Sequence, residues 1–177
     1  MNEARVTQVT ASRESLEAAG FVGFTAAVTV QLDRCERVPV ERGVYVVLRD
    51  PEYPVQFRAK SPAGHYRGVD PTLPVEILSK RWIEGATVLY IGVAPGTGVR
   101  ALLQQRIKRT VRFGGGADIA HPGGAALWQL EGSMQLRFAW KVLQEDPRPF
   151  AAALLAEFVA RHGRAPFAQD DQEVVDE

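Results

Sequence analysis

Two short runs of apolar residues constrain the fold of this chain more than any other feature. Residues 43–48 and 87–93 are rich in valine, tyrosine and leucine and are bounded by charged or turn-forming residues, a pattern typical of buried strands. Each run alone is too short to form a hydrophobic core of its own, so we assign both to one domain. The stretch of about residues 50–86 between them is therefore an insertion, and not a linker between two domains.

Prolines dominate the first part of this insertion. Five of the 11 prolines of the chain lie between residues 50 and 75, which predicts loop or short edge structure there. A helix is expected at about residues 75–82.

Hydrophobic periodicity predicts the remaining elements. They are a short helix at 12–19, an extended segment at 21–32, a helix that begins at residue 99 and ends at the glycines 114–116, strands at 127–130 and 136–143, and a helix at 150–162 with Leu154, Leu155, Phe158 and Val159 on its buried face. This order predicts one domain over residues 1–169, including an N-terminal extension at 1–40, followed by an acidic tail at 170–177.

The composition argues against a disordered, a collagenous and a coiled-coil chain. Of the 177 residues, 46% are hydrophobic and 24% are charged, which is the mixture of an ordinary globular domain. Cys35 is the only cysteine, so an intrachain disulfide is excluded, and we expect this residue to be a buried small hydrophobe. No apolar run has the length of a membrane span or the layout of a signal peptide, so we expect no membrane partner and a cytoplasmic location.

The formal net charge of zero is the sum of two unequal parts. Residues 170–177 hold five acids and no base, so residues 1–169 carry all 21 basic groups against the remaining 16 acids, a net charge of +5. A basic body is compatible with a nucleic-acid partner, although the zero total is not an argument for one.

The helix expected after residue 99 concentrates positive charge. Between residues 100 and 112 there are five basic residues and no acidic one. The basic residues are Arg100, Arg106, Lys108, Arg109 and Arg112. Arg106 falls at the margin of the apolar stripe, where a partly desolvated guanidinium is suited to bidentate phosphate binding, and Lys108, Arg109 and Arg112 fan out over the solvated side. An ordinary solvated helix face is the alternative interpretation of the same charges.

Two tripeptides suggest a family. Gly43-Val44-Tyr45 in one predicted strand and Tyr90-Ile91-Gly92 in the next, followed by the helix that carries Arg106, resemble the signature of the GIY-YIG nuclease superfamily. The resemblance extends over about residues 40–169. It includes residues 61–72, which look like an insertion of one bacterial subgroup, the turn His121-Pro122-Gly123-Gly124, and the closing segment 162–168.

The resemblance implies a fold and an activity. The fold is a small mixed α/β (α+β) domain with a central three-stranded antiparallel sheet flanked by helices, and the activity is that of a metal-dependent DNA endonuclease. Tyr45 and Tyr90 would position or deprotonate the attacking water, Arg106 would neutralise the scissile phosphate, and His121 would orient the water or the leaving group. Glu157 would hold Mg²⁺ or Mn²⁺.

Binding of the DNA substrate would fall to other polar residues, which are Lys108, Arg109, Arg112 and Gln169. The sequence has no separate DNA-recognition domain, so a nuclease of this size is expected to act as a homodimer or with a partner chain.

Two departures from the family pattern favour an alternative function. The family places a metal-binding acid near the start of the last helix, where this chain has the alanines 151–153, and the nearest carboxylate, Glu157, has the i, i+4 spacing of an ordinary ion pair with Arg161. Gln169 stands where the family usually has asparagine. The alternative is a catalytically degenerate module that binds DNA or a protein partner without cutting.

The acidic tail has two open interpretations: a solubilising end, or an intramolecular competitor that covers the basic helix. Under the second hypothesis, deletion of residues 170–177 increases the affinity for a DNA duplex, because five competing acids are removed. Fluorescence anisotropy at fixed salt measures this affinity, and an unchanged value would reject the competition.

Overall fold

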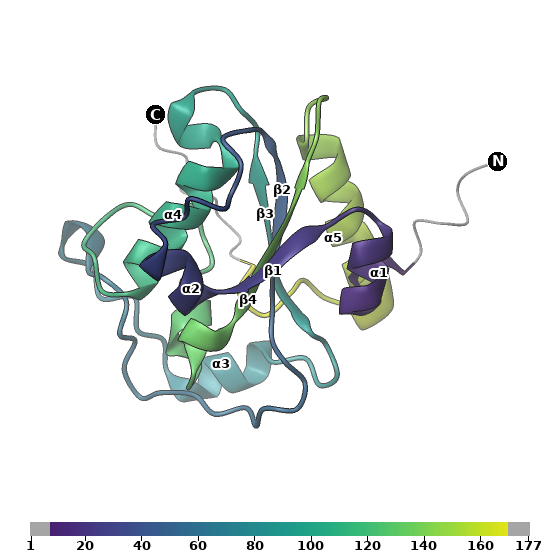
Figure 1. The fold of residues 1–177 in the computed structure, drawn as a ribbon. Helices are drawn as coiled ribbons and strands as arrows, with labels where there is room; N and C mark the ends of the chain where they lie inside the picture. The colour runs from purple at the N-terminus through teal and green to yellow at the C-terminus, as the bar shows by residue number, and fades with distance from the viewer. Residues whose placement is uncertain (1–7, 170–177) are drawn as a thin grey trace.

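A computed structural model describes residues 8–169, and the tail predicted at 170–177 lies outside them. The helices and strands follow one another in the order α1 (Arg13–Ala18), β1 (Val22–Ala26), α2 (Ala27–Leu32), β2 (Gly43–Leu48), α3 (Val75–Arg81), β3 (Val88–Ala94), α4 (Leu103–Gly114), β4 (Arg137–Val142) and α5 (Arg148–His162), with short 3₁₀ turns between some of them (Figure 1). None of the helices in this part of the chain is long and apolar enough to cross a membrane.

The strands form one antiparallel sheet in the order β1-β4-β2-β3. The mixed α+β class is therefore confirmed, but the sheet has four strands where three were expected. The additional strand comes from the N-terminal extension. Residues 21–32, predicted to be one extended segment, divide into β1, which pairs with β4, and the helix α2.

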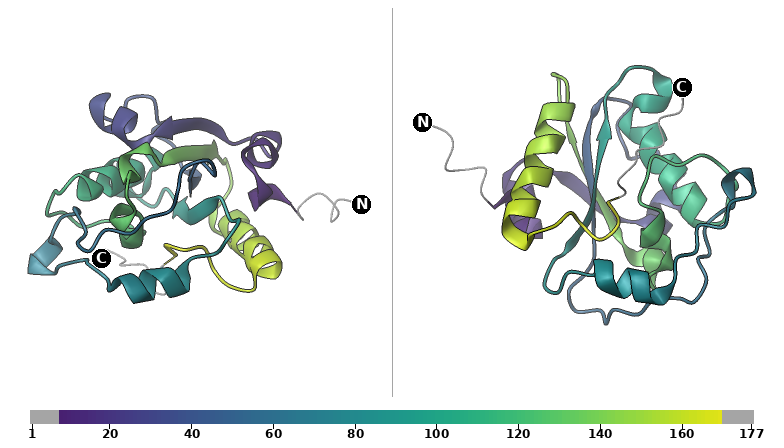
Figure 2. Two further views of the ribbon diagram at one scale, coloured as in Figure 1. Left: turned by 90° about the horizontal axis from the view of Figure 1, so that it is seen from below. Right: turned by 180° about the vertical axis from the view of Figure 1, so that it is seen from behind.

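Helices cover both faces of this sheet (Figures 1 and 2). Strand β2 is buried along its whole length, and its side chains alternate between two cores. Tyr45 and Val47 belong to the core that includes residues of α2 and α4, whereas Val44 and Val46 belong to the core that includes residues of α1 and α5. The burial of both faces explains why this run is apolar without interruption.

Several of the other predicted elements are confirmed. The helix expected from residue 99 begins only at Leu103, after a 3₁₀ turn at Val99–Ala101, and one predicted strand is wrong. The helix expected at 75–82 is α3, the strand expected at 136–143 is β4, and the last helix is α5, ending at Gly163 in the left-handed conformation. The strand expected at 127–130 is instead a 3₁₀ turn, Ala125–Gln129, which follows Gly123 and Gly124 with their positive φ values.

The buried face of α5 is also narrower than expected. Leu154 and Phe158 are buried, as predicted, but Leu155 is only partly buried and Val159 is 38% exposed. Leu155 instead lines the cleft described below.

The outer edge of the sheet is protected by the closing segment. Strand β3 is an edge strand, and exposed strand edges favour aggregation. Ala168 donates its backbone N–H to the carbonyl of Leu89, and the side-chain amide of Gln169 pairs with both backbone groups of Ile91, at 3.0 and 2.9 Å. The side-chain amide of Gln169 therefore makes the two hydrogen bonds to Ile91 that a neighbouring strand would otherwise make.

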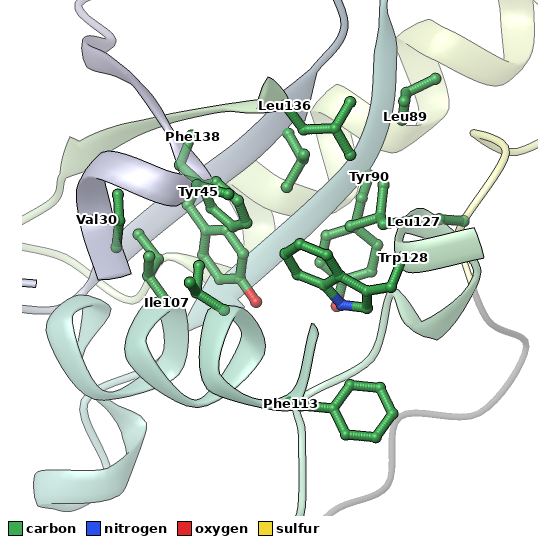
Figure 3. Close-up of a cluster of buried hydrophobic side chains, with 14 of the residues drawn as sticks. Val30, Tyr45, Leu89, Tyr90, Ile107, Phe113, Leu127, Trp128, Leu136 and Phe138 are labelled. Carbon is green, nitrogen blue, oxygen red and sulfur yellow. The ribbon is translucent and has the colours of Figure 1, made fainter. Parts of the chain in front are cut away.

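A close contact fixes the pairing of β2 with β3. Tyr45 lies opposite Gly92, and its ring carbons would come within 2.2 Å of a Cβ atom at position 92. Figure 3 shows the hydroxyl of Tyr45 pointing toward α4, and the ring of Trp128 packs against the end of the same helix at Gly114. Only glycine leaves enough space at position 92 for the Tyr45 ring.

The substitution Gly92→Ala is predicted to lower the free energy of unfolding by about 2 kcal/mol or more, because the added methyl group overlaps a fully buried ring. Urea unfolding measures the change. Gly98→Ala is the matched control, since nothing lies within 4 Å of its Cβ position and its φ of 174° suits any residue, so its effect stays within about 0.5 kcal/mol. Equal stability of the two variants would contradict the packing account.

Candidate anion-binding cleft

A cleft of about 680 Å³ opens between β3, the start of α4 and α5. Its apolar surface comes from Ile91 and Val93 of β3 and from residues of α5, including Leu155. Basic and polar side chains from several elements also line it, and they are Thr97, Arg100, Arg106, Arg109, His121, Arg148 and Gln169.

The charge of this cleft has one sign. Four arginines line it, and no carboxylate does among the described residues. Arg148 is paired with an acid that does not line the cleft: its guanidinium bonds to both carboxylate oxygens of Asp146, with 2.8 Å for the closest pair. These hydrogen bonds lower the pKa of Asp146 and raise that of Arg148.

Arg106 is held differently. Its side chain projects from α4 beside the buried Leu103 and Ile107, and its Nε is inaccessible to water. Within residues 8–169 this Nε has no hydrogen-bond partner. A buried donor without a partner is costly, because the protein loses the hydrogen bond that water would have made. Arg106 therefore presents a donor that a bound anion could satisfy.

His121 is fixed by the loop around it. Its ring stacks on Phe113, with centroids 3.9 Å apart, and its Nδ1 accepts the backbone N–H of Gly123 at 3.2 Å. Tyr90 donates its hydroxyl to the carbonyl of Pro122 at 3.0 Å, and Arg109 donates Nε to the carbonyl of Ala120. Two side chains from the neighbouring elements thus hold the loop in place.

The two motif tyrosines lie in the core. Tyr45 is fully buried and Tyr90 is 3% exposed, their ring centroids are 5.9 Å apart, and neither lines the cleft. Tyr45 packs on Gly92 and stacks on Phe138. In this arrangement, the first tyrosine supports the sheet and the second anchors the loop of His121.

Glu157 lies away from the cleft. Its carboxylate accepts the backbone N–H of Thr10 at 3.2 Å, the Thr10 hydroxyl and the guanidinium of Arg161. The side of α5 that faces the cleft instead carries Ala151, Ala152 and Leu155. The structure therefore does not bring Glu157 together with Arg106 and His121, as the predicted metal site requires.

The described residues do not fit a resident Mg²⁺ or Mn²⁺ ion in the cleft. Magnesium prefers carboxylate and other hard oxygen ligands, whereas the charged side chains of this cleft are cationic. Between residues 8 and 169 no group of three or more histidine, cysteine, aspartate or glutamate side chains could hold a metal ion.

The residues predicted to bind substrate divide into two groups. Arg109 lines the cleft, as does Gln169, although the amide of Gln169 is bonded to Ile91. Lys108 and Arg112 instead line a separate groove between α2 and α4.

Comparison with known proteins adds no assignment. No family model, curated protein or solved structure matches this chain significantly. The chemistry of the cleft is therefore the basis for a function.

Sequence reasoning missed one cleft arginine, Arg148, and named Arg100 among the basic residues without assigning it to the site. Arg148 begins α5, where the helix dipole disfavours a positive charge. That unfavourable position, directly after Asp146 and Pro147, is a signal that the sequence offered.

If Glu157 is structural, Glu157→Ala lowers the free energy of unfolding by about 2 kcal/mol, because Thr10 loses a buried, charged acceptor. DNA affinity should stay unchanged. Urea unfolding and anisotropy measure the two effects, with the exposed Glu52→Ala as the control for stability. Unaltered stability together with weakened DNA binding would contradict the structural role.

Proposed function

We propose that this chain is a DNA-binding protein of the GIY-YIG type, which holds backbone phosphates in the arginine cleft. The observation that carries the proposal is the cleft itself: four arginines, no carboxylate among the described lining residues, and a buried Arg106 Nε without a partner among residues 8–169. Guanidinium groups bind phosphate oxygens through directed, charge-assisted hydrogen bonds.

The surroundings of Arg106 strengthen such binding. Its partly buried side chain is restrained by the packing of α4, so little conformational freedom is lost when a phosphate binds. The apolar residues Ile91 and Val93 exclude part of the solvent, and charge interactions gain strength where water is excluded. Arg106 is therefore the cation of the cleft that we expect to contribute most.

The spread of the charges favours a polymer over a small anion. The arginines come from three parts of the fold, namely the turn before α4, α4 itself and the start of α5. A cleft of about 680 Å³ with separated cations suits a chain of phosphates, which binds several cations at once. The resemblance to GIY-YIG nucleases points to DNA as that polymer.

Binding without cleavage is the better-supported form of this proposal. One observation favours an endonuclease: Arg106 and His121 line the same cleft. However, Tyr45 is buried in the core, Glu157 is bonded to Thr10 and Arg161, and the cleft residues do not fit a metal ion. The predicted catalytic set is therefore not assembled by the described residues.

The substitution Arg106→Gln should weaken binding of a 20-base-pair duplex about 10- to 100-fold at moderate salt, because one charge-assisted phosphate contact is lost. Anisotropy titrations over a salt series should also show the slope of log K against log salt reduced by about 0.9. Arg67→Gln removes an exposed arginine outside the cleft and should change neither value. A flat salt response of the unaltered protein would exclude nucleic acid and favour a protein partner.

A plasmid-nicking assay with Mg²⁺ or Mn²⁺ separates binding from cutting. We expect no nicking that depends on the protein's own residues. Metal-dependent nicking that is lost in both Tyr90→Phe and Arg106→Gln would overturn the non-cutting form and restore the endonuclease hypothesis.

A further inference from the structure

A second basic site lies on the other side of α4. A groove of about 400 Å³ runs between α2 and α4, with the buried Val30 and Val111 as its apolar floor. Three cations line it, Arg34 in the turn after α2 and Lys108 and Arg112 on α4. Arg34 and Arg112 are exposed and Lys108 is half-buried.

These charges are not neutralised by the acids around them. Among the described residues no carboxylate lines the groove, and no salt bridge of its three cations is observed. Asp33 is adjacent in sequence, but one of its oxygens accepts the backbone N–H of Cys35 at 3.0 Å and the other pairs with Arg37. Like the cleft, the groove therefore attracts anions.

Helix α4 joins the cleft to the groove. At about 100° per residue, Arg106, Arg109, Arg112 and Lys108 follow one another around the helix over about 160°. The segment Leu103–Gly114 contains no acidic residue. These four cations thus form a band of positive charge around α4, with the cleft at one margin and the groove at the other, and Arg112 is the exposed member of a band whose other members are half-buried.

We propose that α4 lies in the major groove of a DNA duplex, with the backbone of one strand in the arginine cleft and the backbone of the other in the α2–α4 groove. The dimensions agree, since a helix with its side chains is about 10–12 Å across and the major groove is about 12 Å wide. This inference rests on the proposed DNA binding and adds the form of the ligand, a duplex contacted on both strands.

The test compares variants of the full chain on a 20-base-pair duplex, by anisotropy over a salt series. The double variant Lys108→Gln and Arg112→Gln should reduce the magnitude of the salt slope by about 2, because two phosphate contacts are lost. The control removes two exposed lysines outside both sites, Lys60→Gln with Lys80→Gln, and should leave the slope unchanged.

A third variant, Arg34→Gln, tests the groove from α2 and cannot disturb α4 itself. It should reduce the slope by about 1, whereas circular dichroism should stay that of the unaltered chain. The duplex should also bind more tightly than a single strand of the same length, since only the duplex places a backbone on each side of α4.

The outcomes distinguish this inference from the proposed function. If Arg106→Gln weakens binding but the groove variants behave like the lysine control, the second site is refuted and the cleft stands. If single-stranded DNA binds as tightly as the duplex, the major-groove placement is refuted. If the unaltered chain binds neither form with a salt-dependent affinity, the proposed function itself fails.

Discussion

The packing of Tyr45 against Gly92 is the constraint on which the remaining structure depends. It aligns β2, which is buried on both faces, with β3, and the chain leaves β3 directly toward α4. The same strand then receives Gln169 along its outer edge, which places the end of the described chain beside the cleft. The position of Arg106 on α4 relative to Arg148 on α5 therefore depends on the pairing of β2 with β3.

The packing of the core explains why glycine and tyrosine stand in both tripeptides, Gly43-Val44-Tyr45 and Tyr90-Ile91-Gly92. Gly43 is as constrained as Gly92, because a Cβ atom there would lie 2.1 Å from the carbonyl oxygen of Lys141. Tyr45 fills the core and Tyr90 anchors the loop before Gly123. The requirements of the fold alone thus account for the glycines and tyrosines of the two tripeptides, while the phosphate binding proposed above rests on arginines outside them.

Periodicity and turn residues predicted much of the fold, for physical reasons that also explain the errors. The strands at 43–48 and 136–143 and the helices at 75–82 and 150–162 have strong local patterns, and each is observed. The break between β1 and α2 has no glycine or proline to mark it, and the apolar run at 127–130 is short enough to suit a strand or a buried turn. Such ambiguities are decided by packing against distant parts of the chain.

The site was predictable to a similar extent. Arg106, Arg109 and His121 were expected at a phosphate site and all three line the cleft. Periodicity indicates which face of a helix is buried, but not which distant element packs on the other residues, so the contact of Glu157 with Thr10, 147 positions away, was not foreseeable. The most direct test of the account is a crystal structure of the chain with a short DNA duplex. We predict a phosphate oxygen within about 3 Å of the Arg106 Nε, and a bound duplex whose phosphates all lie outside the cleft would contradict the account.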